Sequence, residues 1–283
     1  MNTTVGLNKL RSYLATFLLY ALLVATAIIV LLPVVWIVIS SLNPGDTLLS
    51  TSLWPKALTL DHYRDLFTKT DYPRWYMNTL KIATANMFLS TFLVVTSAYA
   101  FSRFRFPGRR AGLMAMLVLQ MFPGFMGMVA IYILLLQLGL LDNLWGLVLV
   151  YAGGSIPFGA WLVKGYFDGI PRSLEEAARI DGATNTQIFL KVMLPLSYPI
   201  LTFIMLNNFI SPWMDFIFAR LVLRSQANKT LAIGLFEMVT GTGNTKFTTF
   251  AAGAVLVAIP ITLLFLFLQK YLIEGLTAGA NKG

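Results

Sequence analysis

The chain has 283 residues, of which 57% are hydrophobic and only 12% are charged, and its mean hydropathy is +0.73. Soluble domains carry about 25% charged residues, so this composition predicts a membrane protein. The absence of cysteine excludes disulfide and thiolate chemistry, and a single histidine, His62, excludes a multi-histidine metal site. The net charge of +9 does not indicate nucleic-acid binding, because the lysines and arginines flank apolar segments instead of gathering on one face.

Six apolar segments are each long enough to cross a bilayer, which needs about 20 apolar residues. They are residues 13–42, 82–102, 111–138, 143–163, 196–219 and 247–269. The first resembles a signal peptide with a cleavage pattern at residues 25–27, but it stays apolar to Trp36, beyond the roughly 7–15 residues of such a region. We therefore expect a retained span and an all-α integral membrane protein of one domain, residues 1–283, with six transmembrane helices.

The short loops between these segments predict the orientation of the chain. The loop between the second and third segments holds Arg103, Arg105, Arg109 and Arg110. The next loop holds only Asp142, so the positive-inside rule places the arginine loop in the cytoplasm. With six spans, both termini and residues 164–195 are then cytoplasmic, whereas residues 43–81 and 220–246 face outward. The apolar spacing within residues 58–67 predicts a short amphipathic helix at the outer surface.

Residues 171–195 form a polar segment between the fourth and fifth apolar segments, and their pattern predicts a helical hairpin. Two pairs have the spacing of a capping box: Ser173 with Glu176, and Thr184 with Gln187. The first box predicts that a helix starts at Leu174, and Gly182 suits the left-handed position just beyond its end. The second box opens another helix that runs toward Leu194 and Pro195.

One face of the first hairpin helix carries small side chains and is open to close approach by another protein. By the spacing of three and four residues, this face holds Leu174, Ala177, Ala178 and Asp181. Glu176 has two interpretations, because it either caps its own helix or contacts a partner. Glu175 and Asp181 are expected to be free for a positively charged partner in both cases.

The hairpin resembles the EAA loop of ATP-binding-cassette importer permeases. The matching residues are Glu176-Ala177-Ala178, Gly182 and Leu194-Pro195, with Val192 in the place of an isoleucine. In that family the hairpin is the coupling helix, which docks in a cleft of the ATPase subunit. The resemblance implies ATPase-coupling roles for Glu175, Glu176, Ala177, Ala178, Asp181, Gly182, Leu194 and Pro195.

Further segments resemble one branch of these importers, the maltose-type (MalG-like) sugar permeases. They are residues 98–108, 120–123, 164–167 and 275–283. The resemblance implies the type I importer permease fold in the bacterial cytoplasmic membrane and import of maltose or maltodextrin. A galacto-oligosaccharide or another small solute is the alternative. The implied partners are a second permease subunit in a heterodimer, two ATPase subunits that hold ATP and Mg, and an extracellular sugar-binding protein.

The sequence agrees with a transport subunit that binds no cofactor and is not an enzyme. It contains no G-x-x-x-x-G-K-[ST] phosphate loop, and Gly241-Thr242-Gly243 lacks the required lysine. An ion-coupled carrier would need charged residues within the spans, where only Asp215 is a candidate. An intramembrane enzyme would need a cluster of acids or histidines that the spans do not contain.

Polar residues at mid-membrane depth are candidates for a sugar path, because they usually face a cavity or another helix. These candidates are Gln120, Ser155, Asn207 and Asn208, with Trp213 as a candidate stacking surface. At 1.5 Å per residue, Asn207 and Asn208 lie about 12–14 Å into the membrane. Contact between helices is the alternative role, and pairing with Arg220 is the alternative for Asp215.

Two peripheral segments also have two interpretations. By resemblance, residues 225–246 reach the binding protein, and by composition they are a solvated connector. Similarly, residues 277–283 extend between the ATPase subunits by resemblance, and by composition they are a disordered end.

Overall fold

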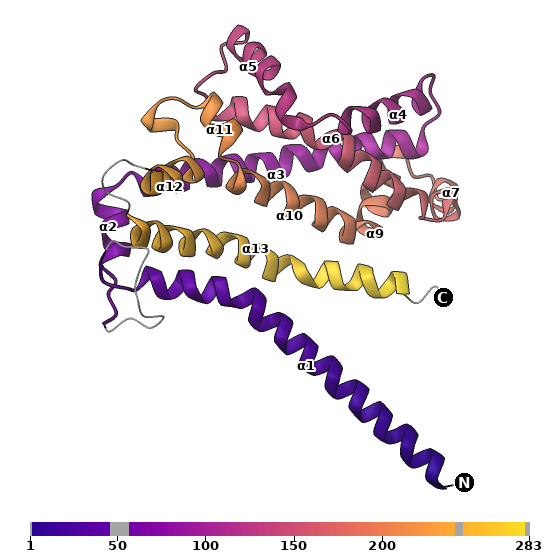
Figure 1. The fold of residues 1–283 in the computed structure, drawn as a ribbon. Helices are drawn as coiled ribbons and strands as arrows, with labels where there is room; N and C mark the ends of the chain where they lie inside the picture. The colour runs from indigo at the N-terminus through magenta and orange to yellow at the C-terminus, as the bar shows by residue number, and fades with distance from the viewer. Residues whose placement is uncertain (1, 46–56, 241–245, 281–283) are drawn as a thin grey trace. The chain divides into compact units, whose positions relative to one another are not determined.

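The computed structural model describes residues 2–45, 57–240 and 246–280, and helices account for most of these residues (Figure 1). No strand occurs in these ranges, so the prediction of an all-α protein is confirmed. The chain divides into two compact units. One comprises Met1–Lys69 and Met238–Leu256, and the other comprises Thr70–Glu237 and Val257–Gly283.

The first unit contains α1 (Asn2–Ser41), α2 (Asp61–Lys69) and the beginning of α13 (Phe247–Ala280). The predicted amphipathic helix is present as α2, which buries His62 and Leu66. The ring nitrogen Nε2 of His62 donates to the carbonyl of Asn43 at 2.9 Å, and Nδ1 lies 3.4 Å from the Thr249 hydroxyl. The single histidine therefore serves as a structural link between α2, the end of α1 and α13.

The second unit contains the remaining helices. They are α3 (Tyr72–Arg103), α4 (Arg109–Gln120), η1 (Gly124–Gly127), α5 (Met128–Gln137), α6 (Leu144–Asp168), α7 (Arg172–Ile180), α8 (Asn185–Ile188), the π-helix η2 (Phe189–Met193), α9 (Leu194–Leu196), α10 (Tyr198–Met214), α11 (Ile217–Val222), η3 (Gln226–Asn228) and α12 (Leu231–Thr240). The later part of α13 also belongs to this unit, whereas the last residues of α12, from Met238, belong to the first unit.

Helices α3 and α6 lie side by side and run in parallel through this unit (Figure 1). Near their middle, Gly159 of α6 faces Val94 of α3, and a Cβ at Gly159 would lie 2.7 Å from a Val94 methyl carbon. Near their ends, the Ser102 hydroxyl donates to Asp168 at 2.6 Å. The number of residues between Val94 and Gly159 is almost the same as that between Ser102 and Asp168. This is the pattern of two helices that run in the same direction. Helix α10 packs against α3.

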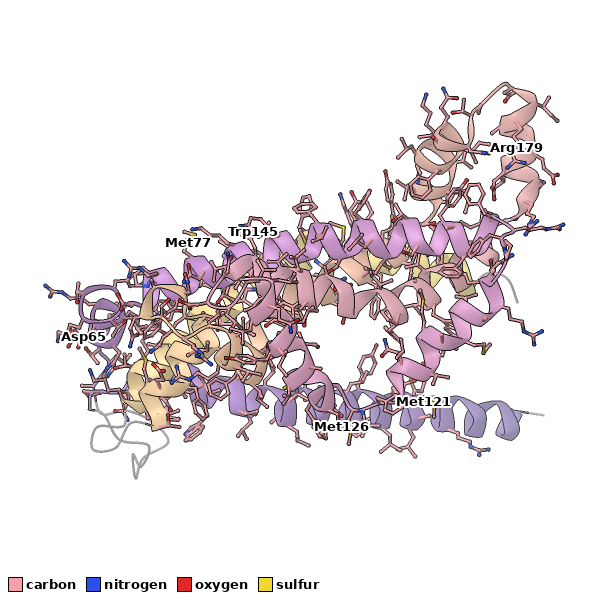
Figure 2. The ribbon with its side chains drawn as sticks, turned by 90° about the horizontal axis from the view of Figure 1, so that it is seen from above. Asp65, Met77, Met121, Met126, Trp145 and Arg179 are labelled. Carbon is pink, nitrogen blue, oxygen red and sulfur yellow. The ribbon has the colours of Figure 1, made fainter. Side chains whose placement is uncertain are left out.

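The third and fifth apolar segments are bent rather than straight. Helix α4 and the η1–α5 pair meet at 97°, at a break where Pro123 takes an extended conformation (Figure 2). The helices of residues 185–196 meet α10 at 81°, and α10 ends at Met214 because the backbone of Asp215 is extended. Four helices are long and apolar enough to cross a membrane, or up to six if each bent pair is one span. The count of six spans therefore stays a prediction.

Asp142 clamps the turn between α5 and α6 to the segment after α11. Its backbone is in the left-handed region, with φ of 55°, and its Oδ1 accepts the backbone N–H groups of Arg224 at 2.9 Å and Ser225 at 3.0 Å. Partial burial opposes ionisation of Asp142, but hydrogen bonds from Ser225, Arg224 and Asn228 outweigh it and lower the pKa of the carboxyl below its usual value.

Two predictions from composition are wrong for the described residues. Residues 225–240 are not a solvated connector, because they form η3 and the partly buried α12, where the ammonium of Lys229 pairs with Glu237 at 2.5 Å. The chain end is helical rather than disordered as far as Ala280, because α13 continues to that residue. The loop at Gly241–Gly243 and the last residues, 281–283, lie outside the described residues.

Candidate functional site

The predicted hairpin is present, but its first helix begins earlier than expected. Helix α7 starts at Arg172 instead of Leu174, and no side chain caps it. The predicted box of Ser173 and Glu176 is therefore wrong. The reason is Pro171, whose fixed φ of −57° suits the position before a helix and whose carbonyl accepts the N–H of Leu174 at 3.3 Å. Ser173 thus lies inside the helix.

The second half of the hairpin agrees with the prediction. Gly182 has φ of +83°, in the left-handed region just beyond α7. The Thr184–Gln187 capping box is formed, since the backbone N–H of Thr184 donates to the Gln187 side chain at 2.8 Å and the backbone N–H of Gln187 donates to the Thr184 hydroxyl at 3.3 Å. The turn between the two helices is therefore built from local sequence.

Glu175 is buried in an ion pair with Arg103, so the prediction that it is free for a partner is wrong. Arg103 is the last residue of α3, and its guanidinium also donates to the carbonyls of Phe167 at 2.9 Å and Ile170 at 3.3 Å. These carbonyls lie at and just beyond the C-terminal end of α6. The sequence did not reveal this pair, because the two residues are far apart in the chain.

The inner side of the hairpin packs into an apolar core formed by α3, α6 and α10. Ile188 and Met193 are fully buried in this cluster, and Ala178 and Leu194 pack against it. Ala178 therefore does not share an open face with Ala177 as predicted. Leu194 therefore helps to hold the hairpin against α3, α6 and α10.

The outer face of α7 carries Glu176, Ala177, Ile180 and Asp181, all exposed. Ile180 is 87% exposed, which is unusual for a large apolar side chain. Sequence analysis missed Ile180, although its position four residues after Glu176 places it on the same helical face. Helix α7 lies beyond the ends of α3 and α6, and the side chain of Arg179 marks it in Figure 2.

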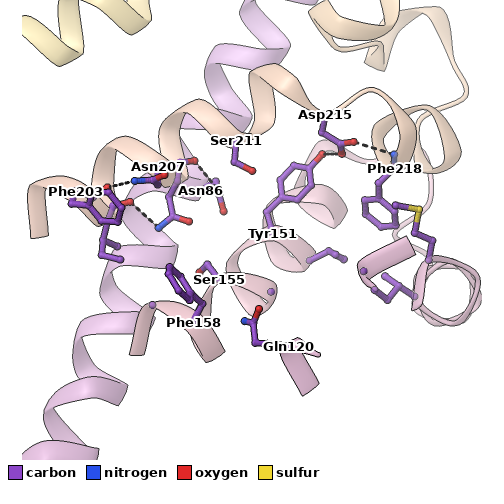
Figure 3. A pocket seen from close by; sticks show the side chains of 18 residues that line it. Asn86, Gln120, Tyr151, Ser155, Phe158, Phe203, Asn207, Ser211, Asp215 and Phe218 are labelled. Carbon is purple, nitrogen blue, oxygen red and sulfur yellow. Dashed lines mark hydrogen bonds between the residues drawn. The ribbon is translucent and has the colours of Figure 1, made fainter. Parts of the chain in front are cut away.

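Four of the five predicted path residues line one cavity of about 610 Å³ within the second unit (Figure 3). They are Gln120 of α4, Ser155 of α6, and Asn207 and Asn208 of α10. Helices α3, α5 and α11, the η1 turn and Asp215 also contribute to the wall. The fifth residue, Trp213, is not in the wall, because it is buried and packs edge-on against Tyr76 with ring centroids 5.4 Å apart.

The amide side chains around the cavity divide into structural and accessible groups. Asn86 is buried and donates to the backbone carbonyl of Asn208 at 2.7 Å, so it joins α3 to α10. Asn208 is also buried and donates to the carbonyl of Ile204 at 3.0 Å. Asn207 is exposed, lines the cavity, and donates through its amide nitrogen to the carbonyl of Phe203 at 2.8 Å.

Asp215 does not pair with Arg220, contrary to one prediction. Its carboxylate accepts the backbone N–H groups of Phe218 at 3.1 Å and Ala219 at 3.2 Å, and the hydroxyl of Tyr151 also donates to it (Figure 3). It therefore caps the start of α11, whereas Arg220 pairs with Glu237 at 2.8 Å.

Tyr151 and Asn86 are cavity residues that sequence analysis missed. Asn86 could have been found by the same test of mid-segment polarity that selected Asn207. Nowhere in residues 2–45, 57–240 and 246–280 do three or more histidine, aspartate or glutamate side chains gather as metal ligands.

Bent apolar helices, a cavity lined in part by amide side chains and a polar helical hairpin are typical of a membrane-embedded transport component. Residues 93–277 match the family described as "Binding-protein-dependent transport system inner membrane component". The chain is 44% identical to the galactooligosaccharides transport system permease protein GanQ of Bacillus subtilis (strain 168), over 97% of this chain and 98% of that protein. It is 40% identical to the maltodextrin transport system permease protein MdxG of the same organism, over 100% and 99% of the two chains.

A solved structure has the same fold. It is the crystal structure of a bacterial ABC transporter involved in the import of the acidic polysaccharide alginate, which matches with a TM-score of 0.80 at 27% identity over 92% of this chain and 97% of that chain. The chain therefore belongs to the family of inner membrane components of binding-protein-dependent transport systems. It is a multi-pass permease subunit of an ATP-binding-cassette importer in the bacterial cytoplasmic membrane, and it is not itself an enzyme.

Proposed function

We propose that this permease imports an oligosaccharide of the maltodextrin class, delivered by an extracellular sugar-binding protein and driven by ATP. The observation that supports this most strongly is the similarity over the full chain to permeases named for maltodextrin and galactooligosaccharides. A galacto-oligosaccharide is the second candidate, supported by the 44% identity to GanQ. In this proposal a second permease subunit completes a heterodimer, and two ATPase subunits hold ATP and Mg.

The proposed topology has six spans with both termini in the cytoplasm. The arginine-rich loop after α3 supports this orientation through the positive-inside rule. The six spans follow if each bent pair, residues 109–137 and residues 185–214, crosses the membrane once. The hairpin of residues 171–195 then lies on the same side as an ATPase.

The proposed docking surface is the outer face of α7. Its exposed side chains, Glu176, Ala177, Ile180 and Asp181, combine one large apolar group with two acids and a small residue. This surface suits a cleft that is apolar in its centre and basic at its rim. The buried Glu175 and the partly buried Ala178, together with Leu194 and Pro195, hold and shape the hairpin behind this surface.

We assign the sugar path to the cavity of Figure 3. Gln120, Ser155 and Asn207 offer polar groups to sugar hydroxyls, because amides and hydroxyls both donate and accept hydrogen bonds. Asn208 supports the wall through its bond to α3, and Trp213 positions α10 through its contact with Tyr76.

Uptake by the complete transporter in proteoliposomes tests the function. Labelled maltotriose is offered with its candidate binding protein and ATP inside the vesicles, and a galacto-oligosaccharide is offered in parallel. We expect accumulation that requires both ATP and the binding protein and that persists when a proton uncoupler is added. Loss of uptake on adding the uncoupler, with ATP held constant, would instead support an ion-coupled carrier.

Asn207→Leu tests the sugar path. It removes the accessible amide from the cavity and keeps an apolar side chain of similar size, so we expect uptake at low sugar concentration to fall about five- to tenfold, the equivalent of roughly one hydrogen bond. The initial rate of uptake measures this. Gln137→Leu removes an exposed amide that does not line the cavity and should leave the rate unchanged. Equal rates for Asn207→Leu and the unmodified protein would exclude Asn207 from the path.

A further inference from the structure

Arg103 and Glu175 form an unusual ion pair for this chain. Their side chains are only 7% and 6% exposed. In every other ion pair between described residues, including the 4.0 Å contact of Arg103 with Asp168, at least one side chain is 34% exposed or more. Stability alone does not explain a buried ion pair. The free-energy cost of removing both charges from water opposes their attraction, and well-packed apolar residues would stabilise the fold equally well.

The guanidinium of Arg103, at the end of α3, contacts α7, the end of α6 and η2, where its Nη2 lies 3.7 Å from the Met193 sulfur. Its Nε donates to Glu175 of α7, and its Nη2 donates to the carbonyls of Phe167 and Ile170 at the end of α6. Its Nη1 donates to the Ser102 hydroxyl at 2.8 Å. Because a guanidinium is planar and rigid, these bonds fix α7 at one distance and angle from both α3 and α6.

The rest of the inner face of α7 offers little other attachment. Ala178 is the residue of α7 that packs against the apolar core, whereas Ile188 and Met193 anchor the second half of the hairpin. Glu176, Ala177 and Ile180 point away from the core and are exposed. The short chain segment from Asp168 to Arg172 already joins α7 to α6. Within α7, the Arg103–Glu175 pair is the polar contact that joins this helix to α3.

The two helices that Arg103 connects to α7 also form walls of the cavity. Asn86 of α3 and Tyr151, Ser155 and Gly159 of α6 are wall residues. We propose that Arg103 is a positioning residue that transmits movement of α7 to α3 and α6, and that its pairing with Glu175 sets how much transport each ATP yields. This inference depends on the proposed function, in which an ATPase moves α7.

The test measures ATP hydrolysed per sugar imported by the assembled transporter in proteoliposomes. Arg103→Lys keeps the positive charge but loses the planar guanidinium that donates to several acceptors at once. We expect the number of ATP molecules hydrolysed per sugar imported to rise about tenfold, while the rate of ATP hydrolysis changes little. The double variant Arg103→Met/Glu175→Met replaces the pair by apolar side chains. It should retain its ATPase subunits and its melting temperature, and still show the raised ratio.

A matched control removes an exposed ion pair elsewhere. Lys69→Met abolishes the pair of Lys69 with Asp65, whose Lys69 side chain is 65% exposed, and should leave the ratio unchanged. A normal ratio in the double Met variant would overturn the inference, and so would loss of the ATPase subunits from that variant, since the pair would then serve assembly alone. Failure of the proposed function is distinguishable, because the unmodified transporter would then show no ATP-dependent uptake.

Discussion

Gly182→Val is expected to reduce import at least about tenfold while the transporter still assembles in the membrane. Gly182 has φ of +83°, where an L side chain costs roughly 1–2 kcal/mol and a β-branched one is especially disfavoured. A Cβ at this position meets no atom within 4 Å, so the effect arises from the backbone and not from a clash. The turn relaxes by changing the angle between α7 and α8, which misplaces the outer face of α7. Uptake and stimulated ATP hydrolysis in proteoliposomes measure this.

Two controls separate backbone strain from added bulk at Gly182. Gly182→Asn should retain most of the activity, because asparagine tolerates the left-handed region better than valine does. Gly165→Val adds the same side chain to a glycine of α6 that also has open space around it but ordinary helical geometry, and it should be nearly neutral. Equal loss in Gly182→Asn and Gly182→Val would show that left-handed geometry is not the reason for the glycine.

Gly159→Ala is expected to lower the stability of the permease by about 1–3 kcal/mol, the usual range for an overpacked core. The added Cβ would lie 2.7 Å and 2.9 Å from the two methyl carbons of Val94, so α3 and α6 must separate. The melting temperature of the detergent-solubilised protein should fall by several degrees, since 1 kcal/mol corresponds to about 2–4 °C in larger domains.

The partner of this contact provides the control. Val94→Ala removes both methyl groups and should restore most of the stability when combined with Gly159→Ala, because the two changes act on one contact. Gly153→Ala, in the same helix with no atom within 4 Å of the added Cβ, should have little effect. If the stability losses of Val94→Ala and Gly159→Ala simply add in the double variant, the loss in Gly159→Ala does not arise from its contact with Val94.

The sequence alone determined the features that depend on neighbouring residues. The long apolar segments predicted the all-α membrane fold, because a bilayer demands continuous apolar helices. Gly182 and the Thr184–Gln187 box predicted the turn and the second half of the hairpin, since both depend on bonds within a few residues. Polarity at mid-segment depth also selected four residues that line one cavity.

The tertiary structure alone decided which charged residues are buried. Adjacent glutamates look alike in sequence, yet Glu175 pairs with Arg103 from another helix while Glu176 is exposed. In the same way, Asp215 caps α11 and accepts from Tyr151 instead of pairing with the nearby Arg220. The cap on α11 is local, but Arg103 and Tyr151 come from segments distant in the chain from Glu175 and Asp215. Only helix packing brings these distant partners within hydrogen-bond distance.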